Sequence, residues 1–163
     1  MKLALLSDSH NNTHNLEKAV AEANKRSCDV LIHSGDLMEP SYIDLLREFK
    51  GNVIFVFGNN DNEKEEIRER SKGSNVLVAG DFYDGVIDGQ RVYVTHYPES
   101  AKIAFLSGSY DVVVFGHTHQ KMTEALGEKI LINPGEIYGR RMEPASWAIY
   151  DTKTKHIEFI EIS

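Results

Sequence analysis

The sequence Val112-Val113-Val114-Phe115-Gly116-His117-Thr118-His119 joins a short apolar run to two histidines two positions apart. Its β-branched and aromatic residues predict a buried strand. Gly116 lets the backbone turn sharply as the strand leaves the sheet, so both histidines fall on the loop at the carboxyl end. Open α/β sheets bind their ligands at this edge, and paired imidazoles suit a divalent metal. One pair does not complete a coordination sphere, so further ligands are expected at other strand ends.

Four more predicted strands end in groups that can bind a metal. They are Asp8 with His10 after residues 2–7, Asp36 after 29–34, Asn59 after 52–57, and His96 after 91–95. A single Gly-Asp after a strand is usually a turn, and a lone strand-end histidine is usually satisfied by hydrogen bonds. Five such ends at equivalent places on one sheet are difficult to explain by turn chemistry alone.

The number of ligands indicates two metal ions. Seven groups exceed what one catalytic ion takes from a protein, because such an ion keeps coordination positions open. A carboxylate can bridge two ions, and Asp36 is the natural bridge. Mixed imidazole, carboxylate and amide ligands favour Mn²⁺, Fe²⁺ or Zn²⁺ over thiolate-type chemistry.

The order of predicted elements indicates an α/β fold with two sheets. Strands and helices alternate up to residue 72, with helices expected over 14–26, 40–50 and 62–72, which calls for a parallel sheet with right-handed crossovers. From Val76 the pattern changes to short strands at 76–79, 82–87 and 91–95, a helix at 99–106, and hairpins over 122–133 and 147–162. We therefore expect two packed sheets with helices outside.

Length and composition indicate one domain over residues 1–163 that does not enter a membrane. The apolar runs are too short to cross a bilayer, and residues 2–7 read as a strand rather than a signal peptide. The net charge of -7 counts against a nucleic-acid partner. The single cysteine, Cys28, fits a reducing compartment, so we expect a cytoplasmic protein. An exposed strand edge could support a homodimer.

Five motifs resemble, in order and spacing, the signature blocks of the calcineurin-like metallophosphoesterases. These motifs are Asp8-Ser9-His10, Gly35-Asp36, Gly58-Asn59-Asn60-Asp61, His96 and Gly116-His117-Thr118-His119. Asn133-Pro134-Gly135 also resembles a loop of the small single-domain phosphodiesterase branch. The resemblance implies a four-layer α/β/β/α sandwich of two mixed sheets flanked by helices.

The same resemblance implies the roles of the residues. One metal would be held by Asp8, His10, Asp36 and His119, and the second by Asp36, Asn59, His96 and His117. The implied activity is hydrolysis of small phosphodiesters by a hydroxide that the two metals activate. We favour Mn²⁺, with Ni²⁺, Fe²⁺ and Zn²⁺ as alternatives, and we assign Asn60 and His117 as the catalytic residues.

Two positions depart from the family pattern. Asn60 stands where many relatives carry a histidine, and an amide cannot deliver a proton at neutral pH, so we expect a bias towards aryl phosphodiesters with acidic leaving groups. Tyr97 stands where relatives often have glycine; its ring could narrow the pocket, stack on a base, or pack in the core.

Several polar residues near these motifs allow more than one interpretation. Arg140 and Arg141 could bind phosphate oxygens or be solvated. Asp61 is expected to cap the following helix, and His33 to be a satisfied core histidine. His14 could replace the missing histidine, although a solvated helix end is the simpler expectation.

Three other functions compete with the hydrolysis of small phosphodiesters. A metallophosphoesterase-like subunit of the retromer sorting complex shares this fold and serves in protein binding, so a catalytically weak or inactive scaffold is the main alternative. A phosphotransferase using Asp8 as nucleophile usually needs a carboxylate two residues on, where this chain has His10. A nuclease is disfavoured by the acidic composition.

Overall fold

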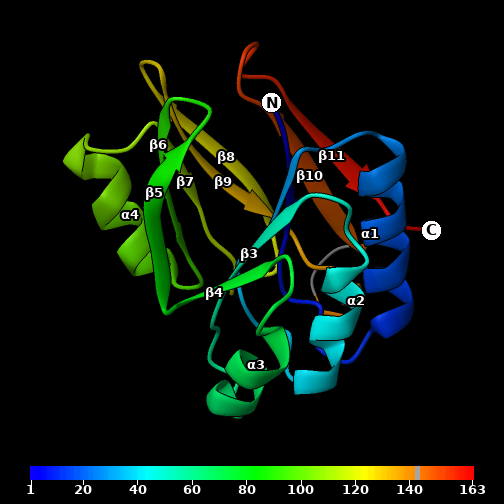
Figure 1. Cartoon of the computed structure of the whole chain (residues 1–163). Helices are drawn as coiled ribbons and strands as arrows, with labels where there is room; N and C mark the ends of the chain where they lie inside the picture. The colour runs from blue at the N-terminus through cyan, green and yellow to red at the C-terminus, as the bar shows by residue number, and fades with distance from the viewer. Residues whose placement is uncertain (142–143) are drawn as a thin grey trace.

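The structure is a computed structural model that describes residues 1–141 and 144–163, and its centre is two β-sheets packed face to face (Figure 1). The first sheet has the order β11 (Ile157–Glu161), β10 (Ser146–Asp151), β1 (Lys2–Leu6), β2 (Val30–His33), β3 (Asn52–Val56), β4 (Val76–Gly80). The second has the order β5 (Phe82–Ile87), β6 (Gln90–Thr95), β7 (Val112–Val114), β9 (Lys129–Pro134), β8 (Lys121–Leu126).

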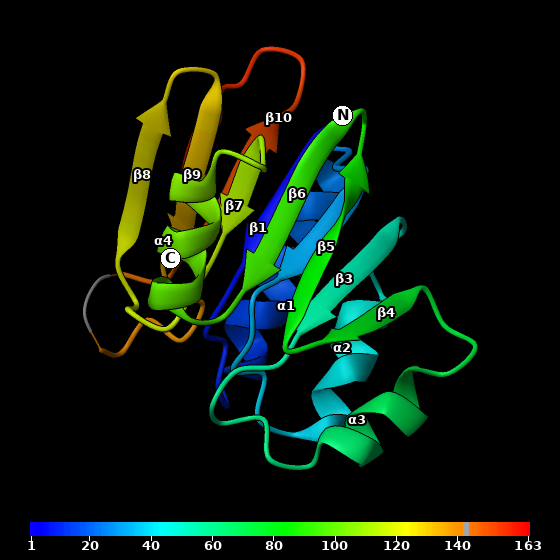
Figure 2. The same ribbon diagram turned by 90° about the vertical axis from the view of Figure 1, so that its left-hand side faces the viewer.

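Helices lie on the outer faces of both sheets (Figures 1 and 2). The first sheet is covered by α1 (Thr13–Lys25), the 3-10 turn η1 (Pro40–Tyr42), α2 (Ile43–Arg47) and α3 (Lys64–Ser71). Helix α4 (Pro98–Ser107) covers the second sheet. The helix expected over 40–50 is shorter than predicted because its first turn, opened by Pro40, is 3-10. No helix in the described part of the chain is long and apolar enough to cross a membrane.

Three apolar cores hold the four layers together. The central core lies between the sheets and includes the fully buried Leu5 and Ile32 from one sheet and Val94 from the other. A second core joins the first sheet to its helices around Trp147, and a third joins the second sheet to α4 around Phe105. This arrangement is the expected α/β/β/α sandwich.

Strand direction brings the carboxyl ends of five strands to one end of the sandwich. Strands β1 to β4 are mutually parallel, and β6, β7 and β9 are mutually parallel in the second sheet. Antiparallel pairings of β5 with β6, β8 with β9, and β10 with β1 and β11 make both sheets mixed. Although the sequence pattern changes at Val76, β4 still belongs to the first sheet. The loops after β1, β2, β3, β6 and β7 carry the polar residues of the site.

Candidate metal centre

The backbone of the ligand loops is held in an uncommon conformation. Five non-glycine residues of the motifs have positive φ angles: Asp8 at 52°, His10 at 45°, Asp36 at 60°, His117 at 69° and His119 at 61°. Left-handed conformations cost non-glycine residues about 1–2 kcal/mol each. Such strain gathers at functional sites, where the surrounding structure enforces it. Here it turns the side chains toward one another as the chain leaves each strand.

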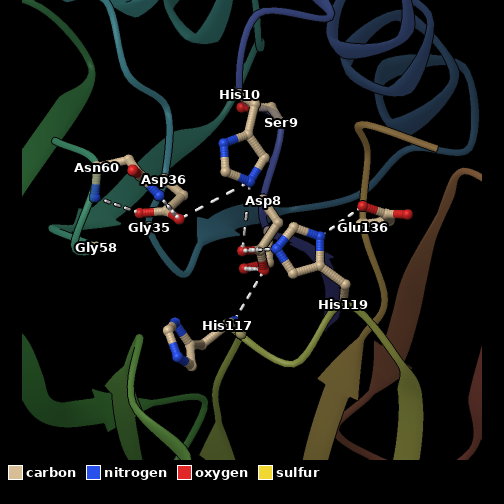
Figure 3. Close-up of polar contacts among 12 residues, drawn as sticks. Asp8, Ser9, His10, Gly35, Asp36, Gly58, Asn60, His117, His119 and Glu136 are labelled. Atoms are coloured by element: carbon tan, nitrogen blue, oxygen red, sulfur yellow. Dashed lines mark hydrogen bonds and ion pairs between the residues drawn. The ribbon is translucent and has the colours of Figure 1, made fainter. Parts of the chain in front are cut away.

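Asp8, His10 and His119 form one half of the centre (Figure 3). Asp8 Oδ1 lies 3.3 Å from His119 Nε2 and 3.9 Å from His10 Nε2, and all three residues are buried. Within residues 1–141 and 144–163, the buried side-chain polar atoms without a hydrogen-bond partner are Asp8 Oδ1 and His10 Nε2. Unpartnered buried polar atoms are costly. A carboxylate oxygen and an imidazole nitrogen are atoms that bind divalent metals, so the pocket fits such an ion.

The other carboxylate oxygen of Asp8 fixes the orientation of the side chain. Its Oδ2 accepts hydrogen bonds from Ser7 Oγ at 2.7 Å and from the backbone N–H of His117 at 3.0 Å. Gly116 permits this approach, because a Cβ there would clash with Ser7 Oγ and lie 2.7 Å from Asp8 Oδ2. Burial raises the pKa of Asp8, against the opposing effects of His96, His119 and Ser7. A bound cation would favour the ionised carboxylate.

Asn59, His96 and His117 form the other half. Asn59 Oδ1 lies 3.1 Å from His96 Nε2 and 2.9 Å from His117 Nδ1, and the two ring nitrogens are 3.2 Å apart. Asp36 Oδ2 lies 3.5 Å from His96 Nε2. Four potential ligand atoms therefore converge on one small volume. Asn59 and His117 are exposed, so this half of the centre faces solvent.

Asp36 lies between the two halves. Its Oδ2 is 3.8 Å from His10 Nε2 on one side and 3.5 Å from His96 Nε2 on the other. Asn60 donates two hydrogen bonds to the same carboxylate, from its backbone N–H to Oδ1 at 2.8 Å and from its side-chain amide to Oδ2 at 2.7 Å. Burial alone would raise the pKa of Asp36, but His96 and Asn60 outweigh it and hold that pKa below its usual range. Asp36 is therefore an anion that lies between the two groups of side chains.

Buried acceptors orient two of the imidazoles. His96 Nδ1 donates to the backbone carbonyl of Ser34 at 2.8 Å, and His119 Nδ1 lies 2.5 Å from Glu136 Oε2. A partner on Nδ1 fixes the tautomer and leaves Nε2 facing the centre. Glu136 is completely buried and was not predicted. The only sequence signal is an acidic residue directly after Asn133-Pro134-Gly135, and nothing in the sequence connects it with His119.

Asp61 does not cap the following helix, contrary to the sequence-based prediction. Its carboxylate does not cap α3, whose N-cap is Glu63 and has no side-chain cap hydrogen bond. It accepts backbone N–H bonds from Asp36 at 2.9 Å, Met38 at 2.8 Å and Gly58 at 2.7 Å. Burial raises the pKa of Asp61, against the three N–H donors. Asp61 therefore ties together the loops that carry Asp36 and Asn59.

Two tyrosines flank the centre. The Tyr97 ring is 36 % exposed and lies edge-on to His96, with centroids 5.4 Å apart, so it belongs to the rim rather than the core. Tyr138, which the sequence did not single out, lies edge-on to His10 at 5.2 Å.

The remaining histidines lie outside the centre. His33 is fully buried, shares a 3.0 Å hydrogen bond with Ser9 Oγ, and accepts from Gly35 N–H at 3.3 Å. Burial lowers its pKa to about 3, so it is neutral, as expected for a satisfied core histidine. His14 and His156 are exposed.

The chain belongs to the calcineurin-like phosphoesterase superfamily, whose domain matches residues 1–155. It is therefore a metal-dependent phosphoesterase, a hydrolase. Phosphodiesterase MJ0936 of Methanocaldococcus jannaschii is 33% identical over 99% of this chain and 98% of its own length. A solved archaeal phosphodiesterase superposes with a TM-score of 0.93 at 32% identity, covering 99% of this chain and 100% of its own.

More distant structures share the fold alone. The phosphoesterase YfcE from Escherichia coli has a TM-score of 0.70 at 22% identity, with full coverage of both chains. A Vps29 variant from Entamoeba histolytica has a TM-score of 0.69 at 16% identity, also with full coverage. The function must therefore be argued from the residues of the site and not from the fold.

Removing the Asp61 carboxylate should destabilise the protein more than loss of a helix cap would. Asp61→Ala leaves two buried N–H groups and the part-buried N–H of Met38 without an acceptor. Each buried group costs about 1–3 kcal/mol, whereas a lost cap costs about 1 kcal/mol. We expect the free energy of unfolding, measured in urea, to fall by about 3 kcal/mol or more. Glu63→Ala, at the exposed N-cap, should change it by less than about 0.5 kcal/mol. A loss near 1 kcal/mol for Asp61→Ala would restore the capping interpretation.

Glu136→Gln should weaken metal binding. The amide is nearly isosteric but carries no charge to polarise His119, and partners of metal ligands typically contribute 10–100-fold to affinity. We expect about a tenfold weaker affinity for Mn²⁺, measured by titration calorimetry on chelator-stripped protein. Glu124→Gln, on the exposed face of β8, should leave the affinity unchanged. Equal affinities in the two variants would show that Glu136 only holds its loop.

Proposed function

We propose that this phosphoesterase hydrolyses small phosphodiesters at a centre of two divalent metal ions. The observation that carries the proposal is the position of the Asp36 carboxylate between two groups of ligand atoms. One metal would be held by Asp8, His10, Asp36 and His119, and the other by Asp36, Asn59, His96 and His117. The mixture of nitrogen and oxygen ligands favours Mn²⁺, with Ni²⁺, Fe²⁺ and Zn²⁺ as alternatives.

The two ions would lower the pKa of a water molecule and neutralise charge on the phosphoryl oxygens. The chain supplies the geometry. Asp8 and His119 are buried and oriented by Ser7 and Glu136. Asn59 and His117 lie on the solvent-facing side, so a substrate would approach there. His117 would thus combine metal binding with contact to the reacting phosphoryl group.

Asn60 would restrict the leaving group. Its amide donates to Asp36 Oδ2 at 2.7 Å, which places it beside the proposed bridge. An amide can stabilise negative charge through a hydrogen bond, but it cannot protonate a departing alkoxide. Esters of acidic alcohols, such as aryl phosphodiesters, do not need that proton. They should therefore be the better substrates.

Two comparisons support diester hydrolysis. A relative that is 33% identical over 99% of the chain is named a phosphodiesterase, and so is a solved structure at 32% identity. Two expectations about the surroundings of the enzyme stay predictions. One is a cytoplasmic location, and the other is a homodimer through an exposed strand edge.

The activity is tested by comparing bis-p-nitrophenyl phosphate with p-nitrophenyl phosphate. Protein stripped with chelator should be inactive, and Mn²⁺ should restore hydrolysis that is faster on the diester. Asp36→Asn should reduce kcat by about 100-fold or more, because it weakens the bridge to both ions. Liberated p-nitrophenolate is followed by absorbance.

The control is metal stoichiometry, measured on the same samples. Two ions bound per chain with no turnover for Mn²⁺, Ni²⁺, Fe²⁺ or Zn²⁺ would contradict the proposal. That result would favour the alternative of a protein-binding scaffold of the Vps29 type. Faster hydrolysis of the monoester would instead indicate a phosphatase.

Asn60→His should broaden the range of leaving groups. An imidazole at this position can donate a proton, so alkyl diesters should gain about tenfold or more in kcat, while p-nitrophenyl esters should change little. The measurement is kcat for a series of diesters with leaving groups of increasing pKa. Asn62→His, at an exposed position two residues away, is the matched control. An equal gain for every leaving group would contradict a proton-donor role.

A further inference from the structure

Two arginines beside the centre, Arg140 and Arg141, form no ion pair with a carboxylate in the part of the chain that the structure describes. The chain contains seven arginines. Five of them form ion pairs with carboxylates, namely Arg26, Arg47, Arg68, Arg70 and Arg91. Arg140 and Arg141 are exposed and form no ion pair with any residue in the described ranges. Carboxylates are abundant in a chain with a net charge of -7. Two adjacent guanidinium groups that pair with none of the described carboxylates can therefore bind an external anion.

The loop that carries these arginines is fixed to the centre by its backbone. Ile137 N–H donates to the carbonyl of Ser7, and Tyr138 N–H donates to that of Asp8, both at 3.0 Å. The Arg141 N–H donates to Glu136 Oε1 at 2.9 Å, while the other oxygen of Glu136 contacts His119.

Helix α1 adds two more contacts to the same loop. Asn12 Nδ2 donates to the carbonyl of Tyr138 at 2.9 Å, and Asn15 Nδ2 donates to that of Ile137 at 2.9 Å. The loop therefore presents its arginines at a defined place rather than on a freely moving segment.

Aromatic contacts show where Arg140 lies relative to the side chains of the centre. The Tyr138 ring is edge-on to His10 with a centroid distance of 5.2 Å, and the Arg140 guanidinium carbon lies 5.8 Å from the Tyr138 ring centroid. The Tyr138 ring thus lies between His10 and the Arg140 guanidinium group.

We propose that Arg140 and Arg141 bind a second oxyanion of the substrate, so that the preferred phosphodiesters carry a phosphate or carboxylate on the ester arm beside Tyr138. This inference rests on the proposed function. The guanidinium fork matches both oxyanions in bidentate geometry. At physiological salt, charges are screened beyond about 8 Å, so an extra anion on the substrate is recognised by these neighbouring cations and not by the net charge of the chain.

A matched pair of substrates tests the inference. The p-nitrophenyl phosphodiesters of 4-carboxyphenol and of 4-carbamoylphenol have nearly the same shape and differ by one negative charge. The protein loaded with Mn²⁺ should bind the carboxylate diester about tenfold more tightly, measured as KM in turnover and as Kd by titration calorimetry. Arg140→Gln/Arg141→Gln should remove this preference and leave the KM of the carbamoyl diester within about twofold.

Two further variants separate recognition from general charge effects. Arg26→Gln/Arg91→Gln removes the same charge at the opposite end of the strands and should keep the preference. Arg140→Lys/Arg141→Lys keeps the charge but loses the planar fork, and should retain only part of the preference. Equal Kd values for the two diesters in the unaltered protein, or an equal loss for both in Arg140→Gln/Arg141→Gln, would overturn the inference.

The same experiments distinguish failure of the proposed diester hydrolysis from failure of the inference about the arginines. If the metal-loaded protein hydrolysed neither diester, diester hydrolysis would be refuted. The calorimetric difference between the two diesters would still show whether the arginines bind the second oxyanion. Thermal unfolding of each variant, monitored by circular dichroism, identifies any loss that is due to misfolding.

Discussion

The burial of two carboxylates within a few ångströms of each other is the constraint on which the site depends. Asp8 and Asp36 are almost completely buried, and isolated charges in such surroundings are strongly disfavoured. The chain compensates part of this cost with hydrogen bonds from Ser7 and Asn60 and with the contact between Asp36 and His96. Asp8 Oδ1 keeps no hydrogen-bond partner among the described residues. A cation is the group that completes this balance, which is why metal dependence follows from the arrangement itself.

The fold meets this constraint through strand direction. Parallel strands in both sheets end at the same side of the sandwich, so short loops can bring all the ligands together without long excursions. The price is backbone strain, because ligands such as Asp36 and His117 take left-handed conformations. The surrounding hydrogen bonds, above all those of the Asp61 carboxylate, hold these loops against relaxation.

The sequence predicted those features that depend on local pattern. Strand-end residues such as His96 and His119 could be found because apolar runs locate the strands, and strand ends locate the loops. Glu136 could not be found, because its contact with His119 depends on how two loops of the second sheet pack. Asp61 was misinterpreted for a related reason. A short polar residue before a helix usually caps it, but here the Asp61 carboxylate accepts hydrogen bonds from backbone N–H groups of its own loop and of the loop after β2. Tyr138 could not be predicted either, because its place beside the centre depends on its packing against His10.

The proposed ligands come from both sheets, and this has a consequence for the stability of the whole molecule. Asp8, Asp36 and Asn59 follow strands of the first sheet, whereas His96 and His117 follow strands of the second. Ions bound at this centre would link the two sheets at the carboxyl ends of their parallel strands. Because a ligand that binds only the native state stabilises it by an amount that grows with the logarithm of the free ligand concentration, the free energy of unfolding would then rise with the supply of metal in its surroundings.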